Sequence, residues 1–177
     1  MRMCSIASGS SGNCIYIGDE DTHILIDAGI SRKAIETGLK ELELSGNDLD
    51  GIFITHEHSD HVKGLGVMAR KYHIPMYGTK ETIEAVKAIS SLGNIGEELF
   101  HPVAAEEELQ LKTLTVKPFK VSHDGANPVA YRVESGEKKA AVATDLGIYN
   151  DYTIDHLKGL DVILLEANHD IRMLQTS

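Results

Sequence analysis

The chain has 177 residues, of which 42% are hydrophobic and 25% are charged, and its formal net charge is -10. This size and composition favour one globular domain over residues 1–177, and the charge excludes a protein that coats polyanions over its whole surface. The longest apolar runs, such as Val162–Leu165, are too short to cross a bilayer. The N-terminus lacks the apolar stretch of a secretion signal, so we expect no membrane contact and a cytoplasmic location. Cys4 and Cys14 do not form a disulfide framework and are expected to be free thiols.

The first third of the chain predicts a β-meander followed by a helix. Turn residues separate three apolar segments, which we expect to be strands over Met3–Ala7, Cys14–Ile17 and His23–Asp27. Ser31 is a suitable helix cap, and apolar residues then recur at helical spacing until the helix ends at Gly46. These patterns place a sheet and a covering helix at the start of the fold.

The rest of the chain continues the alternation and then changes to strands. Gly51–Thr55 is a brief apolar strand that runs into a polar cluster, and helical spacing follows the cluster. An extended piece over Ile74–Tyr77 precedes a helix capped by Thr79. From residue 109 onward the pattern is that of strands, expected at Leu109–Leu111, Thr115–Val121, Val129–Glu134, Lys139–Thr144 and Asp161–Glu166. The sequence therefore predicts a layered α/β architecture and contains no glycine-rich dinucleotide or P-loop motif.

The polar cluster His56-x-His58-x-Asp60-His61 brings four metal-ligating side chains within six residues. His56 and His58 are two residues apart in an extended segment, so their side chains point to the same side and can bind one ion. Asp60 and His61 fall where the chain turns into a helix, and their different direction suits a second ion. Packing alone does not explain this density of ligands, although Asp60 could also act as a simple helix cap.

Two further polar residues lie at the ends of later strands. His123 would complete the ligands of the first ion, and Asp145 could bridge two ions about 3.5 to 4 Å apart. Taken singly, each residue could equally be an ordinary turn residue. The sequence thus predicts a binuclear site with the ligands His56, His58, Asp60, His61, His123 and Asp145.

The order of these motifs resembles the metallo-β-lactamase superfamily. The resemblance rests on Leu25-Ile26-Asp27-Ala28-Gly29, on the run from Thr55 to His61, on His123 and on Thr144-Asp145. The segments 7–14 and 166–170 further resemble the YycJ/WalJ subgroup, bacterial proteins described as DNA exonuclease-like hydrolases.

The resemblance implies a four-layer αββα sandwich with the metal site at one edge of its two sheets. It implies that His56, His58 and His123 bind one ion, that Asp60 and His61 bind the other, and that Asp145 bridges them. Asp27 matches the aspartate that steadies the site without touching an ion, or else is an ordinary turn aspartate at a strand end. The family pattern has one more histidine on the second ion and a longer chain, so we expect the C-terminal portion of the fold to be absent from these 177 residues.

Two other groups of residues are candidates for roles in catalysis or substrate binding. Besides Asp60 and Asp145, Glu166 and His169 follow a strand and are expected to act in acid/base catalysis, or else to be ordinary turn residues. The loop that includes Ser10, Ser11, Gly12 and Asn13 could form a backbone nest for a substrate phosphate, or be a flexible hairpin loop.

The function expected from these features is metal-dependent hydrolysis by a hydroxide that bridges two ions. Histidine and aspartate ligands favour Zn²⁺ and also admit Mn²⁺ or Fe²⁺. The subgroup resemblance implies a phosphodiesterase, a 5′-to-3′ exonuclease with DNA as its substrate. Hydrolysis of a thioester or lactone is a second possibility, and an inactive metal-binding fragment or interaction module is a third. The sequence does not indicate an oligomeric state.

Overall fold

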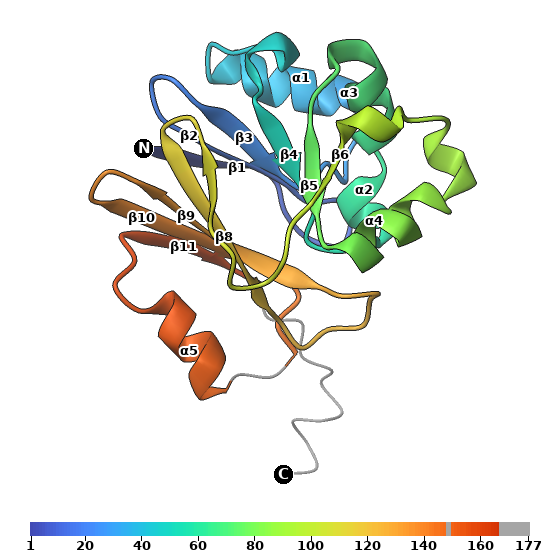
Figure 1. Ribbon diagram of the computed structural model, residues 1–177. Helices are drawn as coiled ribbons and strands as arrows, with labels where there is room; N and C mark the ends of the chain where they lie inside the picture. The colour runs from blue at the N-terminus through green and yellow to red at the C-terminus, as the bar shows by residue number, and fades with distance from the viewer. Residues whose placement is uncertain (148–149, 167–177) are drawn as a thin grey trace.

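The computed structural model describes residues 1–147 and 150–166. They form two stacked β-sheets with helices on the outer side of each, an αββα arrangement (Figure 1). The four-layer architecture predicted from the sequence is therefore confirmed.

The first sheet begins with the expected meander and continues with parallel strands. In spatial order its strands are β1 (Arg2–Ala7), β2 (Cys14–Gly18), β3 (His23–Ile26), β4 (Gly51–Phe53), β5 (Met76–Gly78) and β6 (Phe100–Pro102). Strands β1 to β3 are antiparallel, and β3 to β6 are parallel. Parallel strands start at one edge of a sheet and end at the other, so β3 and β4 deliver the residues that follow them to the same edge.

The second sheet is mostly antiparallel. Its spatial order is β11 (Val162–Leu165), β10 (Lys138–Ala143), β9 (Val129–Ser135), β8 (Leu114–Lys120) and β7 (Leu109–Leu111). Because β9 opposes both of its neighbours and β10 is parallel to β11, strands β8, β10 and β11 all end at one edge. The segments after these three strands therefore meet at that edge.

Helices cover the outer faces of both sheets. Those that follow β3, β4 and β5 lie over the first sheet, and α5 lies on the second (Figure 1). They are α1 (Arg32–Glu41), α2 (Ser59–Val62), α3 (Leu65–Tyr72), α4 (Lys80–Lys87) and α5 (Asp151–Leu157), with short 3-10 turns η1 (Gly46–Asp48), η2 (Ser90–Leu92) and η3 (Glu97–Leu99). Within the described residues, no helix combines the length and the apolar character that a membrane span requires.

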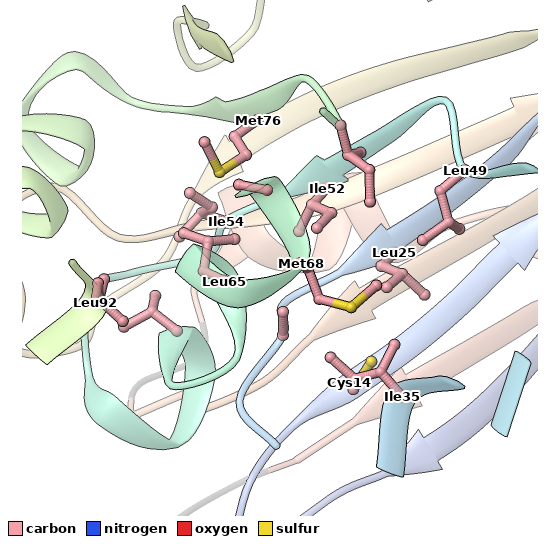
Figure 2. Packing of buried hydrophobic residues seen from close by; sticks show 14 of the residues in the cluster. Cys14, Leu25, Ile35, Leu49, Ile52, Ile54, Leu65, Met68, Met76 and Leu92 are labelled. Carbon is pink, nitrogen blue, oxygen red and sulfur yellow. The ribbon is translucent and has the colours of Figure 1, made fainter. Parts of the chain in front are cut away.

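Two hydrophobic layers hold this arrangement together. Alternate residues of each strand point to opposite faces, so Leu25 packs toward the helices while Ile24 and Ile26 pack toward the second sheet. Figure 2 shows the helix-side layer, in which Ile52 and Met68 are fully buried. Burying one such side chain contributes roughly 1.5 to 3 kcal/mol, which fixes the sheets as a rigid base for the loops at their edge.

The structure corrects three details of the sequence prediction. Helix α1 ends at Glu41, before the expected end at Gly46, because Leu42 caps it and the chain turns there. The helix after the polar cluster is broken at Gly64, where a Cβ would lie 2.2 Å from the carbonyl oxygen of Ile30. Strand β6 was not expected, since three residues carry too short an apolar pattern to be recognised. Both cysteines are free, as predicted.

Candidate metal centre

The candidate ligands all lie in segments that follow strand ends. His56 to His61 come shortly after β4, His123 comes after β8, and Asp145 comes after β10. Asp27 directly follows β3, and Glu166 follows β11. The topology of the two sheets thus collects side chains from distant parts of the sequence at one edge.

Three histidines form the first ligand group. Nitrogen atoms of His56, His58 and His123 all lie within 4.8 Å of one another. The ring centroid of His56 is 4.5 Å from that of His58 and 4.7 Å from that of His123. The Nε2 atoms of His56 and His123 are buried and have no hydrogen-bond partner within residues 1–147 and 150–166. Buried polar atoms are normally satisfied, and a cation between these rings would satisfy them, so the residues present fit a metal ion.

A second group shares His56 and adds His61 and Asp145, with its ligand atoms again within 4.8 Å of one another. His61 Nε2 is 3.0 Å from Asp145 Oδ2 and 3.5 Å from Asp60 Oδ2. Metal–ligand bonds of about 2.0 to 2.2 Å place neighbouring ligand atoms about 3 to 3.5 Å apart, which these distances match. The four predicted residues of the cluster are therefore brought together with both later ligands.

Asp27 lies behind the histidines and fixes their orientation. Its Oδ2 accepts a hydrogen bond of 2.7 Å from His61 Nδ1 and another of 2.7 Å from the Thr55 hydroxyl. Because the hydroxyl proton is directed to Asp27, Thr55 Oγ1 accepts from His56 Nδ1, at 2.9 Å. In their neutral forms both histidines then carry the proton on Nδ1, which leaves Nε2 free to bind a metal ion. Sequence reasoning predicted the role of Asp27 and missed that of Thr55, whose position directly before His56 was its only signal.

The charges of the site shift the pKa values of its histidines in opposite directions. Burial, reinforced by the neighbouring rings of His61, His123 and His58, lowers the pKa of His56 to about 3. Burial also acts to lower the pKa of His61, but the carboxylates beside it outweigh this effect and raise the pKa to about 10. The site thus favours a neutral imidazole at one position and positive charge next to its carboxylates at another.

Backbone contacts lock the polar cluster against two neighbouring loops. The carbonyl oxygen of Asp60 accepts from Asn13 N at 2.7 Å, and that of His61 accepts from Ala28 N at 2.8 Å. Gly29 makes this packing possible, since a Cβ there would lie 1.6 Å from the Asp60 carbonyl oxygen. The position of the ligands is therefore set by close backbone packing as well as by side chains.

The loop predicted to bind phosphate divides into an exposed and a buried part. Ser10 and Ser11 are exposed, whereas Gly12 and Asn13 are buried. The Asn13 side chain contacts His61 Nε2 through Nδ2 at 3.1 Å. Asn13 thus contacts a candidate ligand directly, a role that the sequence did not reveal. Substrate binding by this loop remains a prediction.

Of the two proposed acid/base residues, Glu166 lies within the described part of the chain. Glu166 is half-buried, and its Oε2 atom is buried without a hydrogen-bond partner in the described part of the chain. The Glu166 carbonyl oxygen accepts a hydrogen bond of 3.1 Å from Leu146 N, the residue after Asp145. Burial and the nearby charge of Asp145 raise the pKa of Glu166. His169 lies outside the described residues.

Comparisons with known proteins show what this chain is similar to. The sequence profile of the Beta-lactamase superfamily domain matches residues 22–175. The chain is 41% identical to "Exodeoxyribonuclease YycJ" of Bacillus anthracis over 96% of its length, and 37% identical to "Exodeoxyribonuclease WalJ" of Streptococcus pneumoniae serotype 2 over 97%. It spans 64% of the length of each of these relatives.

Solved structures share the fold at low sequence identity. Zn²⁺-bound PqqB from Methylobacterium extorquens superposes with a TM-score of 0.74 at 18% identity, covering 92% of this chain and 63% of that one. The metallo-β-lactamase SMB-1 superposes with a TM-score of 0.68 at 18% identity, covering 94% and 78%. At such identities the likeness establishes the fold alone.

Proposed function

The chain belongs to the metallo-β-lactamase superfamily, and from this membership we propose that the protein to which it belongs is a metal-dependent phosphodiesterase that degrades DNA. The similarity to proteins named exodeoxyribonucleases supports DNA as the substrate. We propose further that it degrades DNA in the 5′-to-3′ direction. We also propose that the protein is located in the cytoplasm.

In this proposal the chain supplies two adjoining metal positions. His56, His58 and His123 hold the first ion. Asp60 and His61 would hold the second, and Asp145 would serve both, because its Oδ2 lies 3.0 Å from His61 Nε2 and 3.8 Å from His56 Nε2. When bound, divalent ions supply Lewis acidity and activate water at neutral pH, and the ligand set favours Zn²⁺ over Mn²⁺ or Fe²⁺.

The electrostatics of the site support an anionic substrate. The whole chain has a net charge of -10, so it does not attract nucleic acid as a body. Two divalent ions against the two carboxylates of Asp60 and Asp145 leave a net positive centre, which would orient a phosphodiester by its oxygen atoms. Binding is thereby confined to one edge of the fold.

Glu166 is the proton-transfer group of the proposal. Its backbone accepts a hydrogen bond from the residue after Asp145, and one of its carboxylate oxygens is buried and makes no hydrogen bond among the described residues. A carboxylic acid in this position can protonate the departing oxygen of a nucleotide. Its substitution by glutamine should slow turnover and leave metal binding unchanged. The same role is proposed for His169, in the adjacent segment.

The observation that carries the proposal is the convergence of two ligand groups that share His56. The test is cleavage of end-labelled DNA by the full-length protein, with and without a chelator. Asp145→Ala should remove turnover, because it takes away the carboxylate between the two ion positions. Glu84→Ala, which removes an exposed carboxylate on α4, is the matched control.

The outcomes separate the proposal from its alternatives. Metal-dependent cleavage of DNA that Asp145→Ala abolishes would support it. Turnover of a thioester or lactone without cleavage of DNA would replace the substrate and retain the metal centre. Binding of metal without turnover of any substrate by the full-length protein would favour an interaction module. Undiminished cleavage by Asp145→Ala would refute the role of Asp145.

A further inference from the structure

The ligand His123 lies in the loop between β8 and β9, residues 121–128, here called the His123 loop. Its imidazole has little support of its own. The Nε2 atom makes no hydrogen bond within the described residues, and Nδ1 lies 3.3 Å from Oδ1 of Asp124, whose side chain is 83% exposed. An exposed carboxylate is a weak anchor, so the backbone of the loop must place this ring.

One end of the His123 loop is fixed far from the imidazole. The carbonyl oxygen of Asn127 accepts hydrogen bonds from the Thr79 and Thr82 hydroxyls at the start of α4, at 3.0 and 3.4 Å. Asn127 Nδ2 also donates to Glu81. These contacts lie four residues beyond His123 and attach the loop to the helical layer.

Glu57 supports the loop from within the polar cluster itself. It lies between His56 and His58, so its side chain points away from the side on which these two histidines bind an ion. Its Oε1 accepts a hydrogen bond of 2.9 Å from Ala126 N. Its Oε2 is buried and lies next to Gly125, where a Cβ would be 3.4 Å away. The carboxylate is thus packed beneath the turn that follows His123.

The turn needs the conformation that Gly125 provides. Gly125 has a φ of +154°, which side chains with a Cβ rarely adopt. It lets the backbone cross over the polar cluster with Ala126 N directed at Glu57. A hydrogen bond to a carboxylate is stronger than one to a neutral acceptor, so this contact is stronger than the backbone hydrogen bond of 3.1 Å that the Ser122 carbonyl oxygen accepts from Gly147 N beside His123.

We propose that Glu57 is a positioning residue that holds the His123 loop against the polar cluster, and that it thereby sets the affinity of the first metal position. The inference rests on the metal centre proposed above. Glu57 itself does not touch an ion. It couples the two parts of the first ligand group, which come from different sheets, through one hydrogen bond.

The test measures Zn²⁺ affinity by competition with a chromophoric chelator in the full-length protein. Glu57→Ala should weaken the first ion by about 10 to 100-fold, the usual effect of removing a group that orients a ligand. Glu57→Gln should restore most of the affinity, because its amide oxygen can still accept from Ala126 N. Glu84→Ala, an exposed glutamate on α4, should match the wild type.

A double-mutant cycle shows whether Glu57 acts through His123. His123→Ala alone should weaken the first ion, and adding Glu57→Ala to it should cause no further loss. Equal losses from Glu57→Ala in both backgrounds would overturn the proposal. The visible spectrum of bound Co²⁺ provides a second readout, since a displaced His123 changes the coordination of the first ion in Glu57→Ala.

Failure of this inference is distinguishable from failure of the proposed function. If the wild type binds two ions and Glu57→Ala binds them equally well, the inference is wrong and the metal centre stands. If the wild type binds no ion, both are wrong. Should Glu57→Ala not fold, Glu57→Asp replaces it, because the shorter side chain withdraws the acceptor from Ala126.

Discussion

Replacing Asp27 with alanine should both destabilise the protein and weaken its metal site. The carboxylate accepts three hydrogen bonds, from Thr55 N at 2.8 Å, from the Thr55 hydroxyl at 2.7 Å and from His61 Nδ1 at 2.7 Å. Asp27 and His61 each have only 1% of their side-chain surface exposed. Loss of the carboxylate would therefore leave these donors without their acceptor in a region shielded from solvent.

The magnitude follows from this burial. Removing one partner of a buried charged pair costs about 3 to 5 kcal/mol, because the other partner is left without compensation. Asp27 also has a φ of +61°, which alanine tolerates less well than aspartate. The upper part of the range is therefore expected for the metal-free protein. Loss of the group that orients His61 should lower metal affinity by about 10 to 100-fold.

Two measurements check these values in the full-length protein. Urea unfolding in the presence of a chelator gives the change in the free energy of unfolding, and competition with a chromophoric chelator gives Zn²⁺ affinity. Asp21→Ala, in an exposed turn of the same sheet, is the control and should change neither. Asp27→Ala with wild-type stability and wild-type affinity would falsify the orienting role of this carboxylate.

Three other substitutions test the surroundings of the site. Gly29→Ala should cost more than about 3 kcal/mol in urea unfolding, because its Cβ would lie 1.6 Å from the Asp60 carbonyl oxygen; a wild-type midpoint would contradict this packing. Tyr131→Phe removes a buried hydrogen bond of 2.7 Å to the Ile54 carbonyl oxygen and should cost about 1 to 3 kcal/mol in the same assay, so an unchanged midpoint would argue against this bond. Burial acts to raise the pKa of Asp19, but the hydrogen bonds that it accepts lower the pKa from 3.8 to about 2. Its contribution to stability is therefore present above pH 3.8 and lost as the pH falls toward 2, and, discounted for partial exposure, amounts to about 1 kcal/mol. Asp19→Asn should remove this part of the acid dependence of unfolding, and an identical pH profile in the variant would contradict the assignment.

Local patterns in the sequence were sufficient to predict most elements of the fold. Strand and helix periodicity depends on neighbouring residues, so the opening meander and the helix capped by Ser31 could be recognised. The break at Gly64 could not, because Gly64 N donates to the carbonyl oxygen of Ala28, a residue far away in the sequence, and not to the preceding helical turn. Strand β6 was missed because three residues are too few to show an apolar pattern, and its extended form depends on pairing with β5.

In the candidate site, too, some features could be predicted from local sequence and others depend on distant contacts. The spacing of His56, His58 and His61 is a local signal, and the structure brings these residues together as expected. The contact of Asn13 with His61 joins residues 48 positions apart, and that of Glu57 with Ala126 joins residues 69 positions apart. Such pairs leave no periodic pattern in the sequence. They follow from which strands end at the same edge, and that depends on the completed topology.

The geometry of the site depends on how the two sheets are packed together. Asp27 follows β3 of the first sheet and Asp145 follows β10 of the second, and both have left-handed backbone conformations with φ of +61° and +56°. Aspartate is among the few residues that tolerate this conformation, which turns each chain sharply at a strand end. Their carboxylates contact the two nitrogens of one ring, since Asp27 Oδ2 lies 2.7 Å from His61 Nδ1 and Asp145 Oδ2 lies 3.0 Å from His61 Nε2. His61 is thus held between the sheets, and a shift of one sheet against the other would move one carboxylate relative to the ring. The hydrophobic layer between the sheets, which includes Phe53 and Tyr131, therefore determines the positions of the metal ligands as well as the stability of the fold.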